Sequence, residues 1–403
     1  MDKITTKPFA HTFLSEFVFV KKLLPFSDKE IENIDRELAE YEQVFLNPDI
    51  ERSLISRNEL LASFAISKAE NSSLTLQEAQ NVYSLVLANE ELNFISDKIK
   101  KGEKLTRKDY EKLEFFNIAK VFRSLNETKI TIDNITPFNL KEIHQQLSLG
   151  LDVFAKYLPE FTIYKAGKWR DNDNIRVGSY TPAPFIQIEE GVEELLTFLR
   201  KNENITGVAL FHTALYALHP FNNGNKRVCR ILEHIFFRDL GLNQKNLYSS
   251  SYYYHKQKAR YYKNLLYSLE RRNLNHFVSF VQEALILSMI GVVKLSLESK
   301  RSAFLTNQTD DDQIKLILKP LIKRAELQFK NLFRGSKGKV ARQTFVTYLQ
   351  KATKENIVLK RESGRTTYYR LNLKDAPEEE TLNNWLSFAK KRLPYIPDDI
   401  KLA

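Results

Sequence analysis

The stretch His219-Pro-Phe-Asn-Asn-Gly-Asn-Lys-Arg-Val-Cys-Arg230 carries more information about this chain than any other. A neutral imidazole accepts a proton from a hydroxyl near neutral pH, so His219 is a candidate general base. The Asn-Asn-Gly that follows tolerates the positive φ angles of a tight turn. A helix beginning at Asn225 then directs its free N–H groups into that turn, which favours a bound anion. The stretch therefore predicts a base beside a phosphate-binding cradle.

Other residues of the stretch have expected roles of their own. Arg227 and Arg230 are three apart on one helix face, so both are expected to reach the same polyphosphate. Phe221 is expected to be buried and to pin the loop, and Cys229 to lie in the core. A single histidine is more often structural, but these neighbours favour the functional interpretation of His219.

Most of the first 300 residues show helical patterning. Helix-start signals occur at Ser27–Glu30, Thr75–Glu78 and Thr136-Pro137. A helix over 207–219 is expected to place His219 at its C-terminal end, and another over 225–240 to end at Gly241. Helices over about 189–201 and 207–219 follow an interruption at 167–184, which alternates, contains turn formers and predicts a short β-hairpin.

The C-terminal region has a different character. Residues 300–312 are polar and predict a linker, followed by helices at 313–333 and 339–353. Residues 356–373 form two β-prone runs around Ser363-Gly364, and the whole resembles a winged helix-turn-helix. From Lys315 to Arg370 the chain has 15 Lys and Arg against 3 Asp and Glu, a net charge of +12, while the whole chain has +11. Such a block favours contact with DNA or another polyanion, and a solvated basic face is the alternative.

Composition narrows the class of protein. With 403 residues, two or three domains are expected, and the single cysteine, Cys229, excludes internal disulfides. No apolar run reaches the length of a membrane span, and the N-terminus lacks a signal-peptide pattern. We expect a cytoplasmic protein without a membrane partner; secretion by a signal-less route stays open.

The central stretch closely resembles the signature H-x-F-x-[DE]-G-N-G-R-x-x-R of the Fic family. The resemblance covers roughly residues 10–290, with 168–182 at the place of the family's flap and Arg260–Leu265 at its tyrosine-pair segment. It implies a protein adenylyltransferase, in which His219 deprotonates a Ser, Thr or Tyr hydroxyl of a target protein docked on the flap 168–182. That oxygen attacks the α-phosphate of ATP. Phosphate binding is implied for Gly224, Asn225, Lys226, Arg227 and Arg230, and a structural role for Phe221.

Two positions depart from the signature. Asn223 replaces the acidic residue that coordinates Mg²⁺, so the resemblance implies a metal held by a neutral amide and therefore weakly. Lys226 replaces the second glycine of the signature. With a lysine at this position, the chain resembles the Fic relatives that act as kinases. Those relatives lack the final arginine, which this chain keeps as Arg230, and this favours nucleotide transfer.

An inhibitory motif, [ST]-x-x-x-E-[GN], resembles Ser67-Lys-Ala-Glu-Asn71. Glu70 and Asn71 fit, whereas Ile66 occupies the expected Ser/Thr position. By this resemblance, the Glu70 carboxylate pairs with Arg230 and takes the place of the γ-phosphate. An ordinary surface glutamate is the alternative.

The expected fold is mainly α: an N-terminal helical region at 1–135, a helical Fic core with a β-hairpin flap at 136–300, and a winged helix-turn-helix domain at 313–403. Three alternatives to self-inhibited AMP transfer stay open. They are phosphate transfer, removal of AMP from a target, and a non-enzymatic role as a DNA-binding regulator with a degenerate, nucleotide-sensing Fic domain. A homodimer also stays open.

Overall fold

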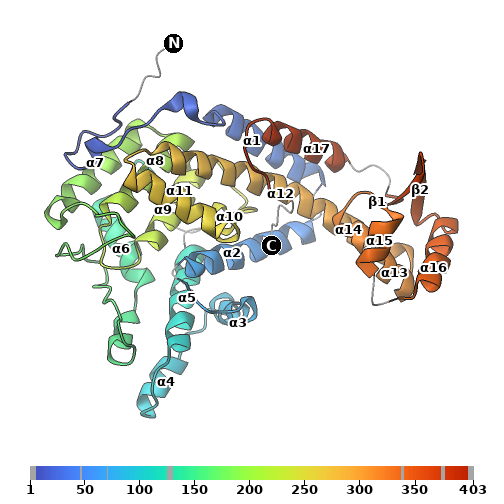
Figure 1. Ribbon diagram of the computed structural model, residues 1–403. Helices are drawn as coiled ribbons and strands as arrows, with labels where there is room; N and C mark the ends of the chain where they lie inside the picture. The colour runs from blue at the N-terminus through green and yellow to red at the C-terminus, as the bar shows by residue number, and fades with distance from the viewer. Residues whose placement is uncertain are drawn as a thin grey trace. The chain divides into compact units, whose positions relative to one another are not determined.

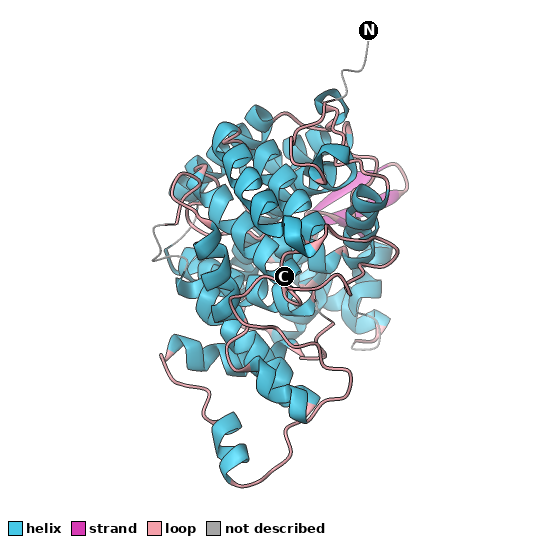
Figure 2. Cartoon of the chain, turned by 90° about the vertical axis from the view of Figure 1, so that its left-hand side faces the viewer, coloured by secondary structure: helices cyan, strands magenta, loops and turns pink. Residues whose placement is uncertain are grey.

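The computed structural model describes residues 6–45, 48–69, 71–124, 130–336, 340–373 and 377–397, and it is mainly helical. The chain divides into two compact units, residues 1–289 and 290–400. Helices make up nearly all of the regular structure, and the described strands form one small sheet (Figure 2).

Figure 1 labels the elements of the first unit, whose bounds are as follows. They are α1 (Asp28–Phe45), α2 (Pro48–Lys68), α3 (Leu76–Leu87), α4 (Phe94–Lys100), α5 (Arg107–Ser124), α6 (Pro137–Leu147), α7 (Ile188–Lys201), α8 (Ile205–Leu218), α9 (Asn225–Asp239), α10 (Ser250–Lys256), α11 (Lys258–Glu270) and the first part of α12 (Asn275–Gln308).

Three helices begin at the predicted caps. Thr75 and Glu78 form a capping box at α3, and Thr136 forms one with Asn139 ahead of Pro137 at α6. At α1, the Ser27 N–H donates to Glu30 Oε2 over 2.9 Å. These side chains satisfy N–H groups that a helix leaves without partners, so local sequence alone defines where these helices start.

Helix α8 lies at the centre of the first unit, and every one of its residues is buried. Helices α7, α9 and α11 pack against it (Figure 1). A helix that is apolar on all sides has to be covered on all sides, so its position follows from its composition. It ends at Leu218, and the predicted helices on either side of the central stretch are confirmed as α8 and α9.

The hairpin predicted at 168–182 is wrong as a two-stranded element. The structure has a single antiparallel bridge, in which Val177 and Tyr180 exchange backbone hydrogen bonds of 3.0 and 3.1 Å around Gly178. The remainder of 167–184 is a loop. Its Asp-Asn-Asp-Asn run at 171–174 favours side-chain turns over a ladder, and the Arg170 side chain binds carbonyl groups of the loop.

Helix α12 corrects two further expectations. The linker predicted at 300–312 is helical up to Gln308. By length and composition alone, α12 is long and apolar enough to cross a membrane, contrary to the expectation from the sequence. Its most apolar stretch is 83% buried inside the protein, which is also the property of a core helix.

The second unit combines short helices with a three-stranded antiparallel sheet of order β1-β3-β2. Its elements are α13 (Asp312–Leu318), α14 (Pro320–Lys323), β1 (Leu327–Gln328), α15 (Phe329–Ser336), α16 (Arg342–Lys354), β2 (Val358–Ser363), β3 (Thr366–Leu371) and α17 (Pro377–Lys390). The single helix predicted at 313–333 is instead three helices and a strand. The helix at 339–353 and the two strands around Ser363-Gly364 are confirmed, with Gly364 at φ +59° in the turn.

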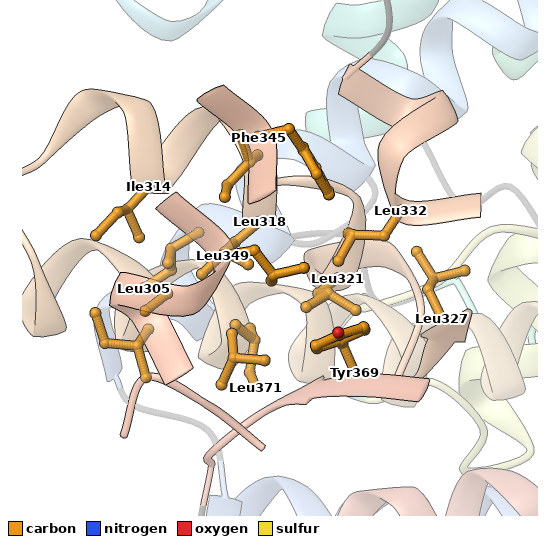
Figure 3. Packing of buried hydrophobic residues seen from close by; sticks show 14 residues of the cluster. Leu305, Ile314, Leu318, Leu321, Leu327, Leu332, Phe345, Leu349, Tyr369 and Leu371 are labelled. Carbon is orange, nitrogen blue, oxygen red and sulfur yellow. The ribbon is translucent and has the colours of Figure 1, made fainter. Parts of the chain in front are cut away.

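One apolar cluster holds this second unit together (Figure 3). Ile314 and Leu318 from α13 meet Phe345 and Leu349 from α16, and Leu371 of β3 closes the cluster from the sheet side. Burial at positions four apart on both helices creates the stripes that pack together. The basic residues are thereby left on the opposite, exposed faces.

Candidate functional site

The site is built on a sharp reversal between α8 and α9. His219 takes a left-handed conformation (φ 53°, ψ 61°), as does Gly224 (φ 81°), which precedes the first residue of α9. Asn225 closes the loop between them. Its Oδ1 accepts from the Phe221 N–H at 2.9 Å, and its Nδ2 donates to the Phe221 carbonyl at 2.8 Å. The side chain expected to bind phosphate is therefore used to shape the loop, as a clamp from its own helix.

Stacking of two aromatic rings, Phe221 and His144, holds this loop in place. Phe221 is fully buried, as predicted, and its ring lies on His144 of α6 with centroids 3.9 Å apart and planes 8° apart. His144 Nδ1 accepts from the Gly167 N–H, and its Nε2 lies 3.1 Å from the Asn223 carbonyl, to which a neutral ring donates. Burial lowers the pKa of His144 to about 4, which keeps the ring neutral in this arrangement.

Sequence reasoning missed His144. It lies on the apolar stripe of α6 together with Leu140 and Leu147, both buried. A polar residue on such a stripe is a signal in itself, because a buried imidazole needs hydrogen-bond partners. Its partners come from distant segments, so their identity was not accessible from the spacing.

A pocket of about 310 Å³ opens beside the loop. His219, Asn223, Gly224, Asn225 and Lys226 line it, which brings together five of the predicted site residues. The remaining walls are Asn222, Arg176, Val177, Gly178, Tyr216, Tyr262, Leu265 and Leu266. The segment expected to lie next to the histidine, 168–182, therefore does contribute a wall, although not as a hairpin.

Arg227 lies behind the loop, outside the pocket lining. Its side chain is fully buried; Nη1 lies 3.0 Å from Glu114 Oε1 of α5, and Nη2 donates to the Tyr164 hydroxyl at 2.6 Å. Tyr110 donates to the same Glu114 carboxylate at 2.6 Å. Nη2 is also 3.5 Å from Asn223 Oδ1. In this structure the guanidinium predicted to bind phosphate is engaged in a buried ion pair that supports the turn.

Arg230 is also buried and outside the pocket lining. Its guanidinium lies over the rings of Tyr261 and Tyr254, 4.4 and 5.4 Å from their centroids. Nη1 donates to the Ala65 carbonyl of α2 at 3.1 Å. The predicted common face of Arg227 and Arg230 thus meets two different parts of the protein, α5 and α2.

The end of α2 lies against the wall of the pocket. The Ala69 carbonyl accepts from the Tyr262 hydroxyl at 2.6 Å and from Lys226 Nζ at 3.4 Å. Lys258 Nζ donates to Asn71 Oδ1 at 2.7 Å. Glu70, the predicted inhibitory residue, lies outside the described residues. The described neighbours on both sides of it are held by cationic and hydroxyl groups of α9 and α11.

A pH dependence of stability follows from His144. Its pKa is about 4 in the folded protein and 6.5 as the unperturbed value, so the unfolded chain binds the proton first. The unfolding free energy should fall as the pH drops from about 6.5 to 4, by about 3 kcal/mol from this residue alone. His144→Phe keeps an aromatic stack but removes the titration, so it should flatten this fall.

Chemical denaturation of both proteins at pH 7.5 and pH 5 measures the difference. His255, whose pKa is also lowered to about 4 by burial, contributes to both profiles and cancels in the comparison. Equal losses of stability in the two proteins would contradict the assignment of a neutral, buried His144.

Residues 134–237 match the model of the Fic/DOC family, and a search of curated proteins finds no match. The structure is similar to a Fic family protein from Desulfovibrio desulfuricans G20 (TM-score 0.48, 18% identity, covering 88% of this chain and 99% of that one). It is also similar to Fic-1 from C. elegans (0.48, 16%, 66% and 72%) and to a Fic domain containing signaling protein from Bacteroides thetaiotaomicron VPI-5482 (0.44, 13%, 66% and 96%). This chain carries a Fic/DOC family domain over residues 134–237.

Proposed function

We propose that the chain is a protein adenylyltransferase, which transfers AMP from ATP to a Ser, Thr or Tyr hydroxyl of a target protein. The observation that carries the proposal is the pocket in which His219 faces the N-terminal turn of α9 within a Fic/DOC domain. The N–H groups of a first helical turn have no partners within the helix, so this end of α9 favours phosphate oxygens. Lys226 adds a cation to the same wall.

The proposed step uses His219 as the base. The imidazole takes the proton of the target hydroxyl, whose oxygen attacks the α-phosphorus of ATP. The bond between that phosphorus and the oxygen bridging to the β-phosphate breaks, and pyrophosphate leaves. His219 is 9% exposed, so it reaches the pocket while most of its ring is surrounded by protein.

The target is proposed to dock along 168–182. Arg176, Val177 and Gly178 line the pocket, and beyond the Val177–Tyr180 bridge the segment has no ladder of its own. An extended peptide adds to such a segment by backbone hydrogen bonds, which would place its hydroxyl opposite the histidine.

Magnesium enters the proposal as part of the substrate, MgATP. The side chains do not fit a resident metal. Asn223 Oδ1 is neutral, accepts from the Gly224 N–H at 2.8 Å and lies 3.5 Å from the Arg227 guanidinium. Among the described residues, no group of three or more His, Cys, Asp or Glu side chains is arranged to hold a metal.

The end of α2 is proposed to act as a brake through Glu70. Two contacts support this: Arg230 donates to Ala65, and Lys226 donates to Ala69, so cations that could bind a triphosphate already bind backbone carbonyl groups at α2.

Phosphate transfer, suggested by Lys226, and AMP removal are the alternatives. Transfer of label from α-labelled but not from γ-labelled ATP distinguishes AMP transfer from phosphate transfer. Release of AMP from a target that already carries it would indicate AMP removal.

Labelled ATP tests the proposed activity. Glu70→Gly should increase labelling of the chain or of a target from α-labelled ATP, because it removes the proposed competitor of the γ-phosphate. His219→Ala in the same background should reduce labelling by at least about 100-fold, the usual contribution of a general base. The proposal fails when Glu70→Gly transfers no label from any nucleotide.

Asn223→Asp tests the metal argument. The added carboxylate supplies a charged oxygen ligand, so half-maximal labelling should need less Mg²⁺ and turnover should rise. A Mg²⁺ titration of the labelling rate measures this, with Asn81→Asp, an exposed position on α3, as the matched change of charge. Equal or lower turnover would contradict the argument that the neutral side chain at position 223 limits the use of Mg²⁺.

The second unit suggests an additional DNA contact. Its short helices, short strand and hairpin support the proposal of a winged helix-turn-helix module. Arg342 at the start of α16 and Arg365 at the tip of the hairpin are exposed, as is Arg370. Three other basic residues are engaged by acids: Lys351 with Asp311, Lys360 with Glu362 and Arg361 with Glu326. Lys337 and Lys339, which belong to the same basic region of the sequence, lie outside the described residues.

A salt titration tests the DNA contact. Replacing Arg342 and Arg365 together by alanine should weaken binding to any duplex and lower the salt slope by about two, because each removes about one phosphate contact. Fluorescence anisotropy at several salt concentrations gives both values, and Arg36→Ala, exposed on α1, is the control. A wild-type chain that binds no duplex at low salt would overturn the contact.

A further inference from the structure

Arg170 is a buried arginine of the first unit that the sequence did not single out. It belongs to the loop proposed to dock the target, but only 3% of it is exposed and it does not line the pocket. Its backbone N–H donates to the Pro220 carbonyl at 2.8 Å, and its Nε donates to the His219 carbonyl at the same distance. The residue therefore binds two consecutive carbonyl groups, those of His219 and Pro220.

The rest of the guanidinium holds the loop. Nη1 donates to the Asn172 carbonyl at 2.6 Å and to Asp173 Oδ1 at 2.9 Å. Nη2 donates to the Ala183 carbonyl and lies 3.4 Å from the Leu218 carbonyl. The arginine thus joins both ends of the loop 172–183 to the end of α8.

The chemistry of a helix end explains why an arginine suits this place. The last carbonyl groups of α8 have no partner within the helix, and the helix dipole favours a cation there. A guanidinium has five donors in a planar fork, so it can serve the helix end with one edge and the loop with the other. A lysine ammonium, as a point charge, cannot cover the same set of acceptors.

His219 also needs such support. A left-handed conformation is unfavourable for a residue with a Cβ, by about 1–2 kcal/mol. The backbone hydrogen bond from the His219 N–H to the Leu215 carbonyl fixes only one side of the residue. The bond from Arg170 Nε fixes the other side, at the carbonyl.

We propose that Arg170 is a positioning residue, which holds the His219 backbone in its left-handed conformation and couples it to the target-docking loop 172–183. The inference rests on the proposed function for its kinetic meaning. Asp173 completes the coupling from the loop side, because its Oδ1 accepts from both Arg170 and the Phe185 N–H, the latter at 2.7 Å.

Kinetic measurements distinguish the contacts of Arg170 with the His219 backbone from its contacts with the loop 172–183. In the Glu70→Gly background, Arg170→Met should lower kcat by about 100-fold, the usual loss for a misplacement of about 1 Å. ATP affinity should fall by a smaller factor, because Asn223 and Gly224 of the loosened loop line the pocket. Arg170→Lys should recover part of kcat, since its ammonium still reaches one acceptor. Asp173→Ala releases only the loop and should raise KM for the target with little change in kcat.

Hydrogen exchange in the free protein tests the same coupling without any activity. Arg170→Met should increase exchange in both 171–183 and 219–224, whereas the control Arg36→Ala should change neither. The inference is overturned when Arg170→Met leaves kcat unchanged, or when exchange increases in the loop alone. If Arg170→Met does not fold, Arg170→Lys carries the same comparison. A Glu70→Gly chain without transfer activity overturns the proposed function, and the exchange pattern then still decides the role of Arg170.

Discussion

The buried ion pair between Arg227 and Glu114 is the contact on which the geometry of the site depends. It joins the first turn of α9 to the middle of α5, and both side chains are about 1% exposed. Removing one partner of such a pair leaves an uncompensated buried charge and typically costs about 3–5 kcal/mol. Because the Asn223 amide lies within reach of the same guanidinium, the pair also fixes the turn that faces the pocket. The same ion pair therefore supports the loop and determines the shape of the site.

The parts of the site that the sequence predicted are those determined by neighbouring residues. The end of α8 at His219, the start of α9 and the positive φ of Gly224 follow from a proline, a glycine and an apolar helix close together. The capping boxes at Thr75 and Thr136 belong to the same group. Each of these features depends on residues within one or two turns, which is the range that spacing and turn chemistry describe.

The parts that were missed depend on partners far apart in the chain. Glu114 lies in α5 beside Phe115 and Phe116, and nothing local shows that its partner is Arg227. His144 and Arg170 likewise bind backbone groups of the loop at 219–223. The prediction of a hairpin at 168–182 was wrong for the same reason, because Arg170 binds carbonyl groups that would otherwise be available to a β-ladder. In each case a buried polar side chain overrode the local pattern.

The double use of Lys226 and Tyr262 has a thermodynamic consequence. Both line the pocket, and both donate to the Ala69 carbonyl at the end of α2. Under the proposed function, a nucleotide and α2 then draw on one set of donors, so their binding is linked and the linkage is reciprocal. The factor by which docking of α2 weakens nucleotide binding equals the factor by which nucleotide loosens α2. A partner protein that draws α2 away would therefore raise nucleotide affinity without touching the pocket.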